Sequence, residues 1–307
     1  MTLAVLLSGQ GGQHPGMFDL TAEHPAAQPV FAAAAPLLGA DPREVARAGG
    51  PRLHENRTGQ ILVCAAALAA WTLVRAVSPA RVIVAGYSVG DLAAWGCAGR
   101  LAPETVLALA AARAEAMDAA AAPGQGLAGL RGLPQARFAA MAEARGCHIA
   151  IRNAPDSVVA GGPHDALEAL CAEAIAAGAQ RAILLPVHTP SHTPLLATAS
   201  ARFRDVLARA PLTGPPRGSP RLLSGLDGAP VFDAAAGLDK LARQISRTID
   251  WAACLEEVLE YGADSVIELG PGHALATMAR TALPAARIHA IEDFRSAAGV
   301  TEWLGAA

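Results

Sequence analysis

The segment RVIVAGYSVGDLAAWG, residues 81–96, constrains the fold more than any other stretch of the chain. It begins with Arg81–Ala85, a mostly apolar run that is typical of a strand buried on both faces. Two glycines then flank Ser88, and Asp91–Ala98 has the pattern of a helix. A strand, a sharp turn and a helix in this order have the geometry of a nucleophile elbow, in which the serine hydroxyl projects above the sheet.

The same GxSxG pattern also has a purely structural interpretation. Glycine permits turns that a Cβ would obstruct, so a tight turn needs small residues even where no chemistry takes place. The chain contains 30 glycines, and a match of this kind therefore carries little weight by itself. Whether Ser88 is a nucleophile depends on the rest of the chain.

Other apolar runs alternate with helical patterns along the sequence. Leu3–Leu7 and Ser265–Leu269 are predicted to be further buried strands, and Ile61–Val74 and Pro103–Ala119 are predicted to be helices. Thr58 is a candidate N-cap, because its hydroxyl could accept from the free N–H groups of a first helical turn. This alternation is typical of a parallel sheet covered by helices, and we expect an α/β fold with an α/β-hydrolase-like core.

The pattern changes between residues 125 and 187, where short strands and helices follow one another in the order βαββαβ. This is the order of a ferredoxin-like unit. It lies between two α/β portions, which favours an inserted subdomain over two domains in tandem. The predicted large α/β catalytic domain comprises residues 1–124 and 188–307, and the predicted small ferredoxin-like subdomain comprises residues 125–187.

Composition and charge exclude several classes of function. The net charge is −3, which provides no basic field for nucleic acid. The five cysteines form no CxxC pair and no Cys/His cluster at zinc spacing, so we expect free thiols in a reducing compartment and no metal. No secretory signal is visible, and the longest largely apolar run, residues 61–74, is shorter than the ~20 residues of a membrane span. We expect a cytoplasmic protein that binds neither nucleic acid nor membrane.

A serine nucleophile needs a base, and nine histidines compete for that role. His188 and His192 lie in a turn-rich segment directly after a predicted strand, where functional loops tend to occur. This favours the pair without separating its members. Asp250 and Glu268 are candidates for a third, carboxylate member of a triad. Arg113 lies on the predicted helix 103–119 among apolar neighbours, either as a solvated helix arginine or as a buried guanidinium with a ligand.

Five separated segments together resemble the malonyl-CoA:acyl-carrier-protein transacylases. They are SGQGGQHPGM near the start, GYSVGDLAA, Arg113 followed by Met117, LPVHTPSHTPLL, and IELGPG near the end. Their order and spacing hold over nearly the whole chain. The stretches GYSVG, SGQGGQHPGM and LARQISRTIDW are most similar to the transacylase (epsilon) subunit of bacterial malonate decarboxylase. Departures from the wider family are Tyr87 for a usual His, Asp91 for Glu, Gly12 for Ser and His273 for Lys.

The resemblance implies roles for individual residues. Ser88 matches the nucleophile and His192 the general base, which leaves His188 as a neighbour. In the family a backbone carbonyl, rather than a third carboxylate, orients the histidine, and Gln244 matches that position. One acceptor on Nδ1 suffices to fix the tautomer of a neutral imidazole.

Three further residues match positions that bind the acyl group. The backbone N–H groups of Gln10 and Val89 correspond to the oxyanion hole, where each donor typically lowers the barrier by about 3 kcal/mol. Arg113 corresponds to the residue that would hold the free malonyl carboxylate through two hydrogen bonds. An acetyl group has no free carboxylate to pair with this arginine. An acetyl donor would therefore leave a buried charge unpaired, which selects against it.

The implied reaction is transfer of a malonyl group from malonyl-CoA to the thiol of an acyl carrier protein through a malonyl-serine intermediate. Two half-reactions through one covalent species imply ping-pong kinetics and no permanently bound cofactor. The expected acceptor has a phosphopantetheine-type arm and belongs to malonate decarboxylase, whose other subunits are further expected partners. The alternatives are a transacylase of fatty-acid or polyketide synthesis, a serine thioesterase and a noncatalytic carrier-binding subunit. Arg145, Arg152 and Arg181 are candidates for a basic face that would receive an acidic carrier.

Overall fold

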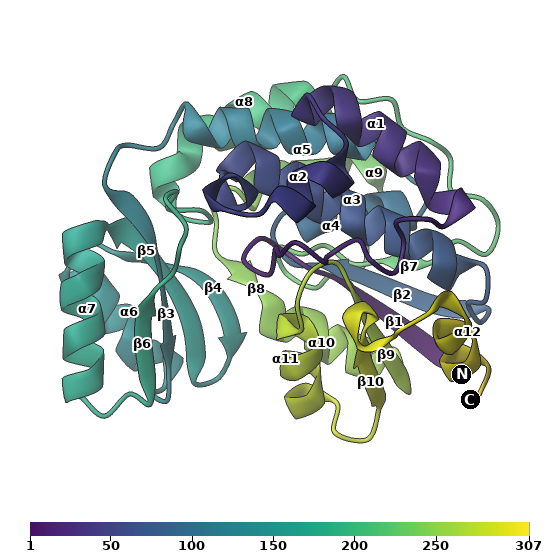
Figure 1. Cartoon of the computed structure of the whole chain (residues 1–307). Helices are drawn as coiled ribbons and strands as arrows, with labels where there is room; N and C mark the ends of the chain where they lie inside the picture. Colours follow the sequence, from purple (N-terminus) through teal and green to yellow (C-terminus); the bar gives the residue numbers. More distant parts are fainter. Residues whose placement is uncertain (307) are drawn as a thin grey trace.

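Two five-stranded sheets organise the chain in the computed structural model, which describes residues 1–306 (Figure 1). The first sheet has the order β10-β9-β1-β2-β7, and all of its neighbouring strands are parallel. Its strands are β1 (Thr2–Leu7), β2 (Arg81–Gly86), β7 (Arg221–Leu222), β9 (Ser265–Leu269) and β10 (Arg287–Ala290). The α/β fold class expected from the sequence is therefore confirmed.

The central strand β1 is buried along its whole length because helices cover both faces of the sheet. Leu3, Val5 and Leu7 belong to one apolar core, and Ala4 and Leu6 belong to another. The first core is formed with the helices α1 (Gln28–Leu38), α3 (Asn56–Arg75), α4 (Gly90–Cys97), α5 (Pro103–Asp118), α8 (Ala197–Leu207) and α9 (Ala234–Arg243). The second is formed with α10 (Trp251–Glu260) and α11 (Ala274–Ala282). The unbroken apolar run of β1 follows from this two-sided burial.

Helix α3 has 20 residues and is long and apolar enough to cross a membrane. However, 89% of its most apolar stretch is buried inside the protein, so α3 is the central helix of the first core. It begins at Asn56, with Glu55 as its N-cap. The expectation that Thr58 caps this helix is wrong, because Thr58 lies within the first turn and its hydroxyl donates to the Glu55 carboxylate. Two shorter helices, α2 (Pro42–Ala48) and α12 (Ala297–Gly305), complete the larger layer.

The second sheet has the order β6-β3-β5-β4-β8 and lies beside the first (Figure 1). Its strands are β3 (Gln125–Arg131), β4 (His148–Ala154), β5 (Ser157–Pro163), β6 (Arg181–Leu184) and β8 (Ile249–Asp250). The helices α6 (Gln135–Ala144) and α7 (His164–Ala176) pack on it around Phe138, Leu167 and Leu170. Four of these strands are antiparallel neighbours, whereas β8 joins β4 in parallel from a distant part of the chain.

Candidate active site

Ser88 occupies the turn between β2 and α4. Its φ angle is 57°, in the left-handed region that residues other than glycine seldom adopt. The flanking glycines are required by close packing: a Cβ at Gly90 would lie 2.2 Å from the Leu7 carbonyl oxygen, and one at Gly86 would lie 2.2 Å from the Asp91 nitrogen. The turn is therefore held against the end of β1, and it fixes the direction of the serine side chain.

His192 faces the serine from the loop that precedes the short helix Pro194–Leu196. Its Nε2 lies 2.8 Å from Ser88 Oγ, and its Nδ1 lies 2.5 Å from the backbone carbonyl oxygen of Gln244. Because a carbonyl only accepts, Nδ1 carries the proton and Nε2 presents its lone pair to the hydroxyl. Burial, reinforced by the nearby positive charge of Arg113, lowers the pKa of His192 to about 3. The imidazole is therefore neutral at physiological pH.

The structure separates the candidates that the sequence left open. His188 is exposed and lines a different cavity from the one that contains Ser88. Asp250 caps α10 by accepting from the Ala253 N–H, and it makes no hydrogen bond to His192. Glu268 is likewise bound elsewhere, so neither carboxylate forms a triad with His192.

Arg113 is fully enclosed on α5, with 1% of its surface exposed, which excludes a solvated helix arginine. Its Nη1 donates to Gln60 Oε1 at 2.8 Å, and its Nη2 lies 3.4 Å from Ser88 Oγ. Burial lowers the pKa of Arg113 to about 10, so the guanidinium stays charged at neutral pH. Within residues 1–306 no carboxylate forms an ion pair with it. A buried cation without a counter-charge is costly, and an anionic ligand at this place would remove that cost.

Two backbone N–H groups near the serine are free to bind a ligand. In the described part of the chain, those of Gln10 and Val89 donate to no protein acceptor. Gln10 lies in the loop after β1, where its side chain donates to the Asn56 carbonyl. Val89 is the N-cap residue of α4, at the positive end of the helix dipole. Both groups are therefore suited to an oxyanion.

A cavity of about 370 Å³ between the two sheets contains Ser88. The first layer contributes Gln10, Tyr87, Ser88 and His192, and the second sheet contributes Leu127, Ile151, Asn153 and Val159. Tyr87 joins the two layers, because its hydroxyl donates to Asn153 Oδ1 at 3.1 Å and its ring packs edge-on against Trp251. The cavity wall is thus polar at the elbow, and on the opposite side Asn153 is the polar residue among the apolar side chains Leu127, Ile151 and Val159.

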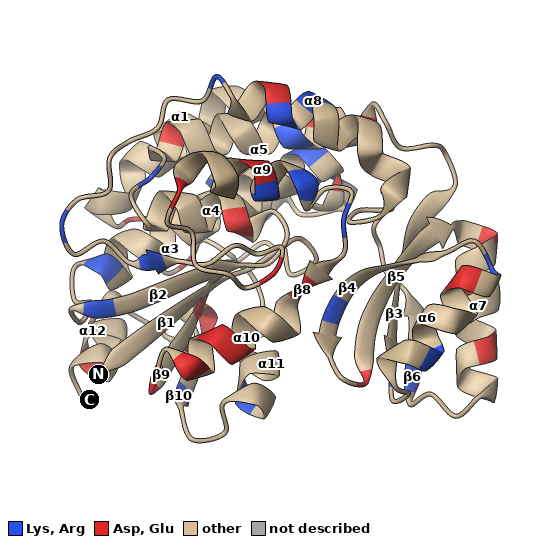
Figure 2. Ribbon diagram, turned by 180° about the vertical axis from the view of Figure 1, so that it is seen from behind, with Lys and Arg blue, Asp and Glu red and all other residues tan. Residues whose placement is uncertain are grey.

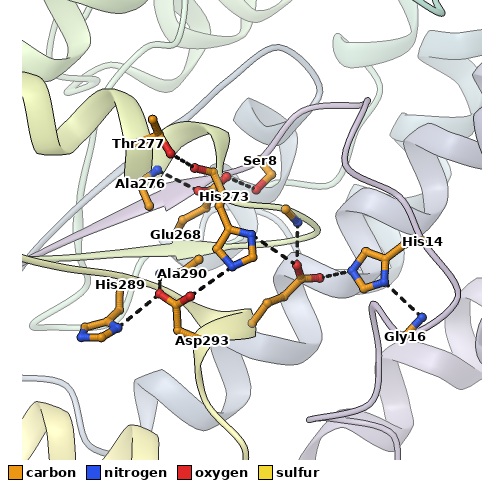
Figure 3. A network of polar contacts seen from close by, with 12 residues as sticks. Ser8, His14, Gly16, Glu268, His273, Ala276, Thr277, His289, Ala290 and Asp293 are labelled. Carbon is orange, nitrogen blue, oxygen red and sulfur yellow. Dashed lines mark hydrogen bonds and ion pairs between the residues drawn. The ribbon is translucent and has the colours of Figure 1, made fainter.

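Figure 3 shows polar contacts made by histidines and carboxylates, and of these residues Glu268 and His273 line the cavity. Glu268 accepts from the Ser8 hydroxyl and from the Ala276 N–H, and burial raises its pKa. Beyond it, His14 Nε2 lies 2.6 Å from the carboxylate of Glu292, which also accepts from the Gly272 N–H. These contacts fasten the loop that carries Gln10 to the loop that follows β9.

Two of the three arginines that are candidates for a basic face lie next to carboxylates. Arg145 is paired with Glu173 at 2.7 Å, and Arg152 lies 3.8 Å from Asp250. Arg181 is exposed on the edge strand β6. Acidic residues run along the neighbouring helix α7 (Figure 2). Among residues 1–306, the one group with metal-ligand spacing, His164, Asp165 and Glu168, also lies on this exposed helix and is absent from the cavity wall.

The parallel α/β fold and the serine that faces a neutral imidazole define an enzyme that moves acyl groups, an acyltransferase. The sequence model of the acyl transferase domain family matches residues 5–295. The chain therefore belongs to this family, and within it to the malonyl CoA-acyl carrier protein transacylases.

Three relatives illustrate the match. The chain is 32% identical over 299 residues to the malonyl CoA-acyl carrier protein transacylase of Mycobacterium tuberculosis H37Rv, which covers 95% of this chain and 96% of that protein. An acyl-carrier-protein S-malonyltransferase from Burkholderia pseudomallei 1710b superposes with a TM-score of 0.90 at 30% identity, over 99% and 100% of the two chains. A malonyl-transacylase solved with its type II PKS acyl-carrier protein gives a TM-score of 0.91 at 25% identity, over 98% and 99%.

Sequence reasoning missed three side chains that support the site: Gln60, Asn153 and Asp91. Gln60 is fully buried, accepts from Arg113 and donates to Asn56 Oδ1 at 2.7 Å. The sequence feature that points to Gln60 is a polar amide at the start of an otherwise apolar helical run. The sequence marks Asp91 only as a departure from the family pattern, although its place three residues after Ser88 puts it on the elbow helix.

Proposed function

We propose that this acyltransferase moves a malonyl group from malonyl-CoA to the thiol of an acyl carrier protein through an ester on Ser88. The observation that carries the proposal is the buried guanidinium of Arg113, which lies 3.4 Å from the serine oxygen and, among residues 1–306, forms no ion pair with a carboxylate. A malonyl thioester has a free carboxylate two carbons from the reacting carbonyl. This carboxylate would neutralise the charge of Arg113 while the thioester lies at the Ser88 hydroxyl.

In the first half-reaction, Nε2 of His192 takes the proton of Ser88 as the hydroxyl oxygen attacks the thioester carbonyl. The carbonyl oxygen becomes an oxyanion, which the N–H groups of Gln10 and Val89 stabilise. The C–S bond then breaks, and the imidazolium returns its proton to the departing CoA sulfur. A malonyl-serine ester and free CoA-SH remain.

The second half-reaction reverses these steps with a different thiol. His192 takes the proton of the carrier thiol, and the sulfur attacks the ester carbonyl. The C–O bond of the ester breaks, and the imidazolium protonates the Ser88 oxygen. Ping-pong kinetics follow from the covalent intermediate, and the mechanism requires no permanently bound cofactor.

The carrier of fatty-acid or polyketide synthesis is the acceptor that the comparisons favour. The curated relative is named a malonyl CoA-acyl carrier protein transacylase, and one similar structure holds a type II PKS carrier. A carrier of malonate decarboxylase is the second candidate. It is supported by Tyr87, which occupies the cavity where the family usually has histidine, and by the stretch LARQISRTIDW.

Intact-mass spectrometry tests the proposal. The enzyme is incubated with malonyl-CoA, and we expect a malonyl adduct that is absent from the Ser88→Ala variant. Adding each purified carrier in its thiol form then identifies the acceptor by loss of the adduct and malonylation of the carrier. An enzyme that never becomes acylated contradicts the proposal. Release of free malonate without any thiol acceptor would instead identify a thioesterase.

A further inference from the structure

Asp91 is a buried carboxylate that the proposed mechanism does not use. It lies on α4, and only 1% of its surface is exposed. Its Oδ2 accepts from Gln244 Nε2 at 2.7 Å and from the Gly225 N–H at 3.0 Å. In residues 1–306, its Oδ1 and the Gln244 Oε1 have no hydrogen-bond partner. An enclosed carboxylate with an unpaired oxygen destabilises a fold. The hydrogen-bond partners of Asp91 therefore need to explain why it is there.

Asp91 binds the side chain of Gln244, the residue whose backbone carbonyl orients the imidazole of His192. Gln244 is fully buried at the C-terminal end of α9, and its backbone carbonyl faces Nδ1 of His192. The next carbonyl along the chain, that of Ile245, accepts from the His192 backbone N–H at 2.8 Å. Residues 244 and 245 therefore set both the ring and the backbone of His192. The bond from the Gln244 side chain to Asp91 connects this segment to the elbow helix.

The hydrogen bonds form a closed ring that returns to the nucleophile. The Asp91 N–H donates to the Ser88 carbonyl at 3.1 Å, and Asp91 Oδ2 accepts from Gln244. The Gln244 carbonyl accepts from His192, and His192 Nε2 faces the Ser88 hydroxyl. A closed ring restrains each member through two neighbours. The distance between Ser88 and His192 is thereby tied to a carboxylate that contacts neither reacting atom.

We propose that Asp91 is a positioning residue that anchors the Gln244 side chain and so keeps the Gln244 carbonyl directed at Nδ1 of His192. The inference rests on the proposed function, since it assigns His192 the part of the base. Asp91 acts through the amide of Gln244 and has no direct contact with the imidazole. Without the anchor, the carbonyl and the imidazole would turn away from the productive geometry.

The kinetic test compares Asp91→Ala and Asp91→Asn with the wild-type enzyme in transient kinetics of Ser88 acylation. Neither Asp91 nor Gln244 lines the cavity, so kcat should fall while KM for malonyl-CoA is unchanged. A small displacement of a catalytic group costs about 100-fold in rate, which we expect for Asp91→Ala. Asp91→Asn should lose less, because its side-chain oxygen still accepts from Gln244. In a double-mutant cycle, Gln244→Ala should add little to Asp91→Ala, because both remove the same bond.

Asp233→Ala is the matched control. Asp233 is an exposed carboxylate that caps α9, the helix that ends next to Gln244, by accepting from the Ala236 N–H at 2.7 Å. Its removal should lower stability with kcat unchanged. If Asp233→Ala lowers kcat as much as Asp91→Ala does, the effect is general loosening of α9 and the inference is overturned.

A second measurement does not depend on activity. The proton on Nδ1 of His192 should give a low-field NMR signal in ¹⁵N-histidine-labelled protein, assigned by its absence from His192→Ala. We expect the signal to move upfield or to disappear in Asp91→Ala and to persist in Asp91→Asn and Asp233→Ala. An unchanged signal in a folded Asp91→Ala protein overturns the inference. Absence of malonyl-serine in the wild type would contradict the proposed function, whereas the NMR comparison would still decide the role of Asp91.

Discussion

Ser88 Oγ and His192 Nε2 lie 2.8 Å apart although 104 residues separate them in the chain. Within residues 1–306 they are also the two residues other than glycine that have positive φ, 57° and 64°. Such conformations cost about 1–3 kcal/mol each and persist only where the surroundings enforce them. Here the glycines of the elbow enforce one, and the bond from His192 to the Ile245 carbonyl supports the other.

Arg113→Ala should lose its preference for malonyl over acetyl donors. Charged hydrogen bonds contribute about 1.5–3 kcal/mol, so the ratio of the two kcat/KM values should fall about 10- to 100-fold. Arg57→Ala is the control, because Arg57 joins the same two helices, α3 and α5, through a partly exposed ion pair with Glu115. A ratio that does not change in Arg113→Ala would remove this residue from malonyl recognition.

The acylation rate should stay nearly constant as the pH falls from 8 to 5. The pKa of His192 is lowered to about 3 by burial and by the charge of Arg113, so its Nε2 remains a free base across this range. A histidine with the ordinary pKa of about 6.5 would be largely protonated at pH 5. The measurement is the stopped-flow rate of CoA release at each pH. A rate that falls with a midpoint near 6.5 would contradict the buried, neutral imidazole.

Asp91→Asn should stabilise the protein more at pH 8 than at pH 5. Burial raises the pKa of Asp91 to about 7 from its ordinary value of 3.8, so between these values the folded state binds a proton that the unfolded state releases. The wild type therefore loses stability as the pH rises through this window, by an amount on the order of a few kcal/mol, whereas asparagine does not titrate. Urea unfolding at both pH values measures the difference. An equal gain in stability at both pH values would contradict a proton held by Asp91 in the folded state.

Gly90→Ala should destabilise the fold by about 1–3 kcal/mol or more, as overpacking of a close contact does. The added Cβ would lie 2.2 Å from the Leu7 carbonyl oxygen and 2.6 Å from that of Ser8, so the elbow must move away from β1. Urea unfolding measures the loss, and acylation of Ser88 should slow in parallel. Gly214→Ala is the control, since no atom of the described residues 1–306 lies within 4 Å of its added Cβ. Equal stability of the two variants would show that the elbow is not tightly packed.

The elbow was predictable because its information is local. The strand, the two glycines and the helix are contiguous in residues 81–98, and the central strand Leu3–Leu7 is apolar enough to be recognised alone. By contrast, β10 is a four-residue, half-buried edge strand, and β8 has two residues, so neither has a pattern to detect. The seven-residue helix α2 is likewise too short to have an extended apolar face.

The surroundings of the serine were harder to predict because they depend on tertiary contacts. Sequence spacing could not separate His188 from His192. The difference is that His192 is buried and bonded to the backbone carbonyls of residues 244 and 245, whereas His188 is exposed. Asp91 was visible as an unusual residue, but its partner Gln244 lies 153 positions away. Such pairs follow from how the sheet and helices assemble, which no local pattern records.

The position of β1 in the middle of its sheet has a consequence for synthesis on the ribosome. One neighbour, β2, is translated early, whereas the other, β9, comprises residues 265–269. Until those residues emerge, the nascent chain exposes one unpaired edge of a strand that is apolar from Leu3 to Leu7, which is a template for aggregation. Proteins truncated before residue 265 should therefore be insoluble rather than merely inactive, even though they retain Ser88, Arg113 and His192.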